Sequence, residues 1–286
     1  MSEWTIQAVL EETVDLLQRA GVGTARRDAE LLLRHLLGQG PAFLVSHPRH
    51  PVGAAERRRL LAYVRRRRGG EPLQYILGYK EFWKDRFLVT PAVLIPRPET
   101  ELLVEYGAGS LATRETPRVL DLATGSGCIG LSILREHPTA VVMATDISPA
   151  ALAVAHANAV RLRLHDRFHL AAGDGTAMFS ESARGYFHLV VSNPPYISTK
   201  DFPNLDPEIR QFEPVGALLA GPDGLAFFRQ WLLPTLTLLA PGGHLLMECG
   251  AEQGTMLAEL VRGASCPTEF FPDLAGRTRV LHMGPV

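Results

Sequence analysis

After residue 98 the chain alternates between short apolar segments and segments with helical periodicity, and this alternation restricts the fold more than any other feature. Strands are expected at 118–122, 140–145, 168–172, 187–192 and 244–249, and helices at 99–111, 128–136, 149–162, 224–239 and 253–262. A final pair of strands is expected at 268–272 and 278–283. Strands separated by helices of this length form a largely parallel sheet with helices on both faces. The sequence therefore predicts a doubly wound α/β fold.

Residues 1–74 have a different character. Apolar residues recur at helical spacing in the segments 6–17, 28–37 and 60–64. Residues 75–96 are rich in β-prone side chains with turn signals between them, which is typical of a β-hairpin. We therefore expect a helical domain at 1–74, a hairpin linker at 75–96 and the α/β domain at 97–286.

The composition is that of a globular protein, with 46% hydrophobic and 21% charged residues among 286. Residues 1–90 contain 15 lysines and arginines against 10 acidic residues, while the remainder contains 14 against 20. This asymmetry suggests two modules with different partners, although it is too mild to require nucleic acid.

Three cysteines lie far apart without a C-x-x-C pair, which excludes a disulfide framework and favours a reducing, cytoplasmic environment. Charged residues run through the first twenty positions, so no secretory signal is expected there. The longest uncharged run, 230–247, is interrupted by prolines and glycines, and we expect no membrane span.

A glycine-rich segment follows the expected strand 118–122. Gly125, Gly127 and Gly130 have G-x-G-x-x-G spacing, and Asp146 ends the next strand. This pattern is typical of dinucleotide binding, because the glycines allow a ligand close to the backbone and the acid accepts ribose hydroxyls. The alternative is a tight strand-to-helix turn with no ligand.

Two features favour S-adenosylmethionine over a nicotinamide cofactor. Asp121 lies four residues before Gly125, where a carboxylate would repel a pyrophosphate but suits the cationic amino group of a methionine moiety. The final strand pair also resembles the antiparallel hairpin that ends methyltransferase sheets. Asp174, after the third strand, is a candidate for contacting the adenine amino group; the alternative is a turn aspartate.

The tetrapeptide Asn193-Pro194-Pro195-Tyr196 directly follows the expected strand 187–192. Ligands of open α/β sheets bind at such strand ends. The Asn193 side chain and the Pro194 carbonyl are two acceptors that could hold both protons of a planar NH₂ group and aim its lone pair. The Tyr196 ring would stabilise the developing positive charge. The alternative is a proline-rich turn with a capping asparagine.

With these motifs, the chain resembles the HemK/PrmC family of release factor glutamine methyltransferases almost from end to end. N-P-P-Y is shared with adenine methyltransferases, whereas Ile95-Pro-Arg-Pro-Glu-Thr-Glu101 is far more specific to this family. The other matching stretches are 72–76, 82–83, 121–127, 146–148, 191–197, 212–214, 221–225, 241–243 and 273–276.

The resemblance implies a Rossmann-like class I methyltransferase sheet of seven strands with an antiparallel last pair, and S-adenosyl-L-methionine as cofactor. It implies N5 methylation of the glutamine in the Gly-Gly-Gln motif of class 1 peptide chain release factors, which tunes translation termination. The N-terminal domain would grip the release factor.

The expected site residues combine this resemblance with the residue patterns. Arg97 and Thr100 would lie beside the cofactor; alternatively they belong to a hairpin-to-helix junction in which Thr100 or Glu99 merely caps the helix. The expected cofactor-binding residues are Asp121, Ala123, Thr124, Gly125, Ser126, Gly127, Asp146, Asp174, Asn193, Arg97 and Thr100. The expected catalytic residues are Asn193, Pro194 and Tyr196, and the expected substrate-binding residues are Asn193, Pro194, Pro195 and Tyr196.

Four positions depart from the family pattern. Ala123 and Lys84 stand where glycine is usual, and Arg277 where an acidic or amide residue is usual. The position after Asp174 is often aromatic in relatives but is Gly175 here, which leaves open what stacks on adenine from that side.

Other residues could have either a functional or a purely structural role. The arginines at 57–59 and 65–68 could contact an acidic partner or RNA, or form a solvated helix face. His165 and His169 are not expected to share a helix face, so no metal site is predicted. Glu213 and Asp223 look like loop-anchoring residues; the alternative is a role in shaping the substrate groove.

Three other functions compete with release factor methylation. The first is methylation of a ribosomal-protein glutamine. The second is adenine N6 methylation of nucleic acid, which the acidic C-terminal part disfavours because it would repel phosphates. The third is a non-catalytic scaffold, which the intact Asn193 and Asp146 argue against.

Overall fold

The structure, a computed structural model, describes residues 4–286 and divides them into two compact units. One unit comprises the chain up to Gly78 together with residues 207–212, and the other comprises residues 79–206 and 213–286. The division differs from the predicted boundaries, because the hairpin belongs to the second unit and a late segment joins the first. Within residues 4–286, no helix is long and apolar enough to cross a membrane.

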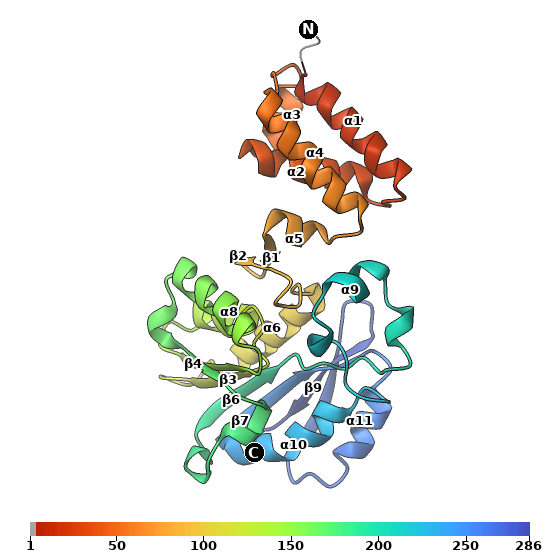
Figure 1. Ribbon diagram of the computed structural model, residues 1–286. Helices are drawn as coiled ribbons and strands as arrows, with labels where there is room; N and C mark the ends of the chain where they lie inside the picture. The colour runs from red at the N-terminus through yellow and green to blue at the C-terminus, as the bar shows by residue number, and fades with distance from the viewer. Residues whose placement is uncertain (1–3) are drawn as a thin grey trace. The chain divides into compact units, whose positions relative to one another are not determined.

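The first unit is helical (Figure 1). Its elements are α1 (Ile6–Arg19), α2 (Ala25–Leu37), α3 (Pro41–Ser46), α4 (Ala54–Arg68), α5 (Leu73–Leu77) and α9 (Pro207–Phe212). The three longest helices each bury an apolar stripe, including Leu17, Leu33 and Leu60. This burial supplies most of the stability of such short helices, which are marginal in isolation.

An almost buried arginine connects α9 to the rest of the helical unit. The Arg67 Nε atom lies 2.7 Å from Asp28 Oδ2, and Nη1 lies 2.6 Å from Glu208 Oε2. Asp28 is 3% exposed and also accepts a hydrogen bond from the Thr24 hydroxyl. Arg67 therefore holds Glu208 of α9 and balances a carboxylate that water does not reach.

The second unit contains a seven-stranded sheet with the order β5-β4-β3-β6-β7-β9-β8. The strands are β3 (Arg118–Leu122), β4 (Val141–Asp146), β5 (Phe168–Ala172), β6 (Phe187–Ser192), β7 (Leu239–Glu248), β8 (Thr268–Pro272) and β9 (Thr278–Met283). Strands β3 to β7 are parallel, and β9 runs antiparallel to both β7 and β8. This confirms the predicted class I methyltransferase fold.

Alternate residues of the strands face two separate cores. Val119 and Leu246 pack with α6 (Glu101–Ser110), α7 (Cys128–Glu136) and α8 (Pro149–Leu162), whereas Leu120 and Leu245 pack with α10 (Ala226–Leu238) and α11 (Gly254–Leu260). Such period-two alternation of apolar residues is what a sheet with both faces covered requires. Figure 1 shows these helices around the sheet.

Short 3₁₀ turns complete the connections. They are η1 (Pro98–Thr100), η2 (His165–Arg167), η3 (Gly175–Met178), η4 (Glu181–Ala183), η5 (Phe202–Asn204) and η6 (Val215–Ala217). The segment between β5 and β6 thus crosses the sheet in 3₁₀ turns, where a doubly wound fold usually has a full helix.

The predicted hairpin at 75–96 is wrong at both ends. Only β1 (Tyr79–Phe82) and β2 (Asp85–Leu88) pair, while Leu73–Leu77 form the helix α5. The apolar side chains of this short helix are buried, and Gly78 ends the helix with φ 78°. The helices α3 and α9 were not expected either, because six residues are too few to show a period.

Replacing Arg67 by methionine should destabilise the helical unit by about 3–5 kcal/mol, because the buried Asp28 carboxylate would lose its partner. Arg58→Met, on an exposed position of the same helix, is the matched control and should change the free energy of unfolding by no more than about 0.5 kcal/mol. Urea unfolding followed by circular dichroism measures both. Equal stabilities of the two variants would contradict this assignment.

Candidate active site

The candidate site lies at the carboxyl ends of the parallel strands. Leu122, which ends β3, is in register with Thr145 of β4 and Ser192 of β6. The Ser192 hydroxyl donates a hydrogen bond to the Leu122 carbonyl (2.8 Å), and the Thr124 amide donates to the Thr145 carbonyl (2.9 Å). The glycine-rich loop, the acid that ends β4 and the asparagine after β6 therefore leave the sheet side by side.

Asp121 holds the glycine-rich loop from below. Its Oδ2 atom accepts hydrogen bonds from the Thr124 hydroxyl (2.6 Å) and the Gly130 amide (3.0 Å). A Cβ on Gly130 would lie only 2.9 Å from that oxygen, so glycine is required for α7 to pack against the strand. Burial raises the pKa of Asp121 to about 7. Asp121 shapes the loop but is not among the residues at the wall of the pocket above it. Its predicted contact with the amino group of a cofactor stays a prediction.

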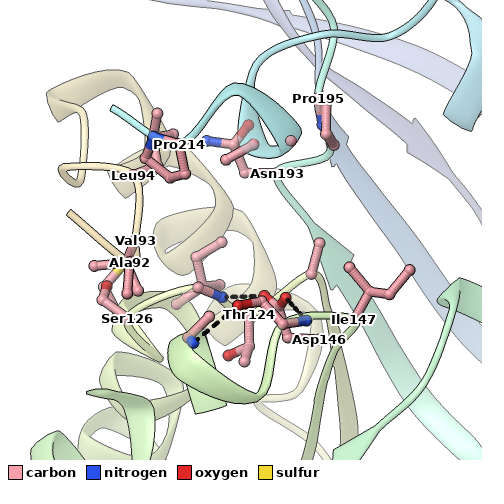
Figure 2. A pocket seen from close by; sticks show the side chains of 18 of the residues that line it. Ala92, Val93, Leu94, Thr124, Ser126, Asp146, Ile147, Asn193, Pro195 and Pro214 are labelled. Carbon is pink, nitrogen blue, oxygen red and sulfur yellow. Dashed lines mark hydrogen bonds between the residues drawn. The ribbon is translucent and has the colours of Figure 1, made fainter. Parts of the chain in front are cut away.

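A cavity of about 490 Å³ opens above the loop. Figure 2 shows Asn193 and Pro214 across this pocket from Thr124 and Asp146. Of the predicted site residues, those at the pocket wall are Thr100, Ala123, Thr124, Gly125, Ser126, Asp146, Asp174, Asn193 and Pro195. Arg97, Asp121, Gly127, Pro194 and Tyr196 are not part of the wall.

The loop itself is open to a ligand. A Cβ on Gly125 would meet no protein atom within 4 Å, and the residue lies at the pocket wall with φ 55°. Ala123, the departure from glycine noted above, adopts φ 56° and also lines the pocket. Left-handed backbone costs an alanine roughly 1–2 kcal/mol, so the loop accommodates this methyl group at a cost in stability.

Asp146 is oriented by two backbone amides. Its Oδ2 atom accepts from Gly125 (3.0 Å) and its Oδ1 atom from Ser148 (2.9 Å). Each carboxylate oxygen has a further lone pair, which suits the two hydroxyls of a ribose. The open loop and this acid fit an adenosyl cofactor.

Asn193 is the first member of a partly buried chain of hydrogen bonds. Its Nδ2 atom donates to the Thr100 hydroxyl (3.1 Å), which donates in turn to Glu248 Oε2 (2.6 Å). The Tyr196 hydroxyl donates to the other oxygen of Glu248 (3.3 Å). Because the Thr100 proton points to the carboxylate, its lone pair faces the NH₂ group of Asn193, and the Asn193 carbonyl oxygen remains available for a ligand.

The charge of Glu248 depends on its burial. This side chain is 1% exposed, and burial raises its pKa from 4.5 to about 7. Thr100 and Tyr196 oppose this rise by donating hydrogen bonds; Arg279 opposes it and Glu99 adds to it through their charges. Burial likewise raises the pKa of Tyr196, so its hydroxyl remains a donor.

Arg97, Glu213 and Asp223 take part in contacts that hold loops. Arg97 Nη2 lies 2.5 Å from Glu213 Oε1, and the other Glu213 oxygen accepts from the Ile95 amide (3.1 Å). Asp223 accepts from the Leu225 amide and pairs with Arg229. These contacts confirm the prediction that Glu213 and Asp223 anchor loops.

Sequence reasoning missed several residues of this site. Glu248 was expected only as part of a strand, although an acid at the buried end of a parallel strand is itself a signal. The wall also includes Ala92, Val93, Leu94, Phe227 and Trp231, which belong to no motif. Among the described residues, no group of three or more histidine, cysteine or acidic side chains could hold a metal ion.

The fold, the open glycine-rich loop, Asp146 and the asparagine after β6 together define an S-adenosylmethionine-dependent methyltransferase. The family model of the PrmC N-terminal domain matches residues 8–78, and that of the methyltransferase small domain matches residues 99–206.

Relatives place the chain more narrowly. The release factor glutamine methyltransferase of Rhodospirillum rubrum is 42% identical over 268 residues, which cover 93% of this chain and 80% of that protein. The Cereibacter sphaeroides protein of the same name is 42% identical and is covered, like this chain, to 95%. The chain therefore belongs to the release factor glutamine methyltransferase family, as its motifs predict.

A solved structure supports the fold alone. The catalytic domain of hMettl16, in complex with MAT2A 3'UTR hairpin 6, superposes with a TM-score of 0.57 at 14% identity. The match covers 88% of this chain and 92% of that one.

Replacing Glu248 by glutamine should slow methyl transfer on the order of tenfold above pH 7, where the native carboxylate is ionised. A glutamine at 248 can donate to the Thr100 hydroxyl, whose proton then points to Asn193. The Asn193 carbonyl oxygen would accept that proton, and its NH₂ group would face the ligand instead of the oxygen. For the same reason the native rate should rise with pH through about 7.

The rate of methyl transfer against pH, at saturating cofactor, checks this prediction. Glu252→Gln, an exposed position beyond the same strand, is the matched control. A Glu248→Gln variant with the native rate at high pH would refute the proposed role of the chain of hydrogen bonds.

Proposed function

We propose that this protein transfers the methyl group of S-adenosylmethionine to the side-chain amide nitrogen of the glutamine in the Gly-Gly-Gln motif of class 1 peptide chain release factors. The observation that carries the proposal is the orientation of Asn193. Its NH₂ group is engaged by Thr100, so it presents a carbonyl oxygen to the pocket, and this oxygen matches an N–H donor of the substrate.

A carboxamide is a difficult nucleophile, because its nitrogen lone pair is delocalised into the carbonyl. Asn193 and the Pro194 carbonyl would accept its two protons and hold the group flat. Fixing this geometry is worth up to roughly 7–11 kcal/mol of the barrier in well-aligned systems. The hydrogen bonds themselves contribute only about 1 kcal/mol each.

The cofactor, when bound, supplies an electrophilic methyl carbon. Asp146 would accept the ribose hydroxyls, and the loop 123–127 would line the methionine end. Since Pro195 is buried beside Asn193 and lines the pocket, it would exclude water on one side of the reacting nitrogen. Tyr196, whose hydroxyl is bound to Glu248, would support the positive charge that develops on that nitrogen.

The substrate assignment rests on relatives whose names specify release factors and which match this chain over nearly its whole length. The match includes the helical N-terminal unit, where the family model of the PrmC N-terminal domain covers residues 8–78. We propose that this unit recognises the body of the release factor while the glutamine enters the pocket.

Transfer of labelled methyl groups tests the function directly. The protein would be incubated with labelled cofactor and one of four acceptors: a class 1 release factor, its Gln→Ala variant at Gly-Gly-Gln, an unmethylated ribosomal protein that carries the rival target glutamine, or duplex DNA. We expect label on the first acceptor alone. If DNA or the ribosomal protein is labelled and the release factor is not, the proposal is contradicted.

Asn193→Ala should abolish transfer to the release factor, because the substrate amide loses the acceptor that orients it. The affinity for S-adenosylhomocysteine, measured by calorimetry, should remain within about threefold, a difference below roughly 1 kcal/mol. This binding measurement is the control for correct folding. Near-native turnover of this variant would remove Asn193 from the mechanism.

A further inference from the structure

Two aromatic side chains line the pocket, and both come from α10. Trp231 is 3% exposed, and its ring centroid lies 4.9 Å from that of Phe227 at an interplanar angle of 62°. Phe227 and Trp231 are the only aromatic residues at the pocket wall within the described part of the chain. A planar heteroaromatic group of a ligand can therefore stack on an aromatic side chain of this pocket only where α10 forms the wall.

Trp231 occupies the space that a side chain at position 175 would need. Gly175 has φ 52°, and a Cβ built there would fall 2.0 Å from the indole Nε1 atom and 2.3 Å from Cε2. The two positions therefore exclude each other: a residue larger than glycine at 175 would have to displace the indole. The aromatic ring at this wall therefore comes from α10 and not from position 175.

The indole is not held by a hydrogen bond. Its Nε1 atom is buried without an acceptor in the described part of the chain. Buried tryptophan N–H groups usually have a partner, and leaving one without costs free energy. Packing alone therefore positions this ring.

Polar groups nearby match a nucleoside. Asp174, directly before Gly175, is exposed at the pocket wall, and Asp146 ends the neighbouring strand. Asp146 suits ribose hydroxyls, and an acceptor at Asp174 suits an exocyclic amine. The base would consequently lie beside Gly175, against the indole.

We infer that Trp231 is a cofactor-binding residue that forms the aromatic wall for the adenine ring, with Gly175 as the residue that makes room for it. This inference rests on the proposed function, since it takes S-adenosylmethionine as the ligand. It assigns to this chain a binding residue outside the glycine-rich loop and outside the strand ends.

Binding of S-adenosylhomocysteine to the full chain tests the inference, with calorimetry and tryptophan fluorescence as readouts. Trp231→Leu fills the space without a ring, whereas Trp231→Phe keeps a flat face. We expect the leucine variant to bind about tenfold more weakly and the phenylalanine variant to stay within about fivefold. Thermal melting of both variants reports whether they fold.

The fluorescence change on binding should disappear in Trp231→Phe and persist in Trp4→Phe and Trp83→Phe, because neither of the latter residues lines the pocket. Native affinity in Trp231→Leu, or equal losses in the leucine and phenylalanine variants, would overturn the inference. Failure of the native chain to bind S-adenosylhomocysteine would instead overturn the proposed function on which it rests.

A double-mutant cycle tests the role of Gly175. Gly175→Ala should weaken binding in the native chain, because its methyl group must displace the indole. In the Trp231→Leu background the same change should cost less, since the crowded ring is gone. Equal effects in both backgrounds would show that the two positions do not share this space.

Discussion

The in-register pairing of parallel strands is the constraint on which the site depends. Because β3, β4 and β6 end at nearly the same level, the glycine-rich loop, Asp146 and Asn193 lie close together at one edge of the sheet. The edge is fixed further by the Ser192 hydroxyl on the Leu122 carbonyl. A shift of one residue in this register would turn every side chain of the strand to the other face, and both cores would be lost.

Two buried carboxyl groups prepare this edge for chemistry. Asp121 organises the loop from beneath, and Glu248 organises Asn193 through Thr100. In both, burial raises the pKa to about 7, which makes the ionised form costly unless hydroxyl or amide donors surround it. Hydroxyl or amide donors reach at least one oxygen of each carboxyl group, so both groups help to fix the orientation of the site.

Local patterns were sufficient to predict the sheet, the loop and the N-P-P-Y segment, because strand alternation, glycine spacing and a proline pair are all properties of neighbouring residues. Glu248 was not predicted, although it ends a buried strand, because its partner Thr100 lies 148 positions earlier and no spacing links the two residues. In the sequence, Trp231 cannot be distinguished from any other aromatic residue of a core helix. Its close packing against Gly175, which points to a role at the pocket wall, is visible only in the folded chain. Helices α3 and α9 are too short for periodicity, and α9 is held by Arg67, an interaction that only the folded chain reveals.

The orientation of Asn193 is the central claim, and a crystal structure of the protein with S-adenosylhomocysteine and a Gly-Gly-Gln peptide tests it most directly. The account predicts the glutamine side chain flat in the pocket, with an N–H donating to Asn193 Oδ1 and the Asn193 NH₂ group still on Thr100. An Asn193 side chain turned away from the glutamine, or a glutamine bound outside this pocket, would contradict it.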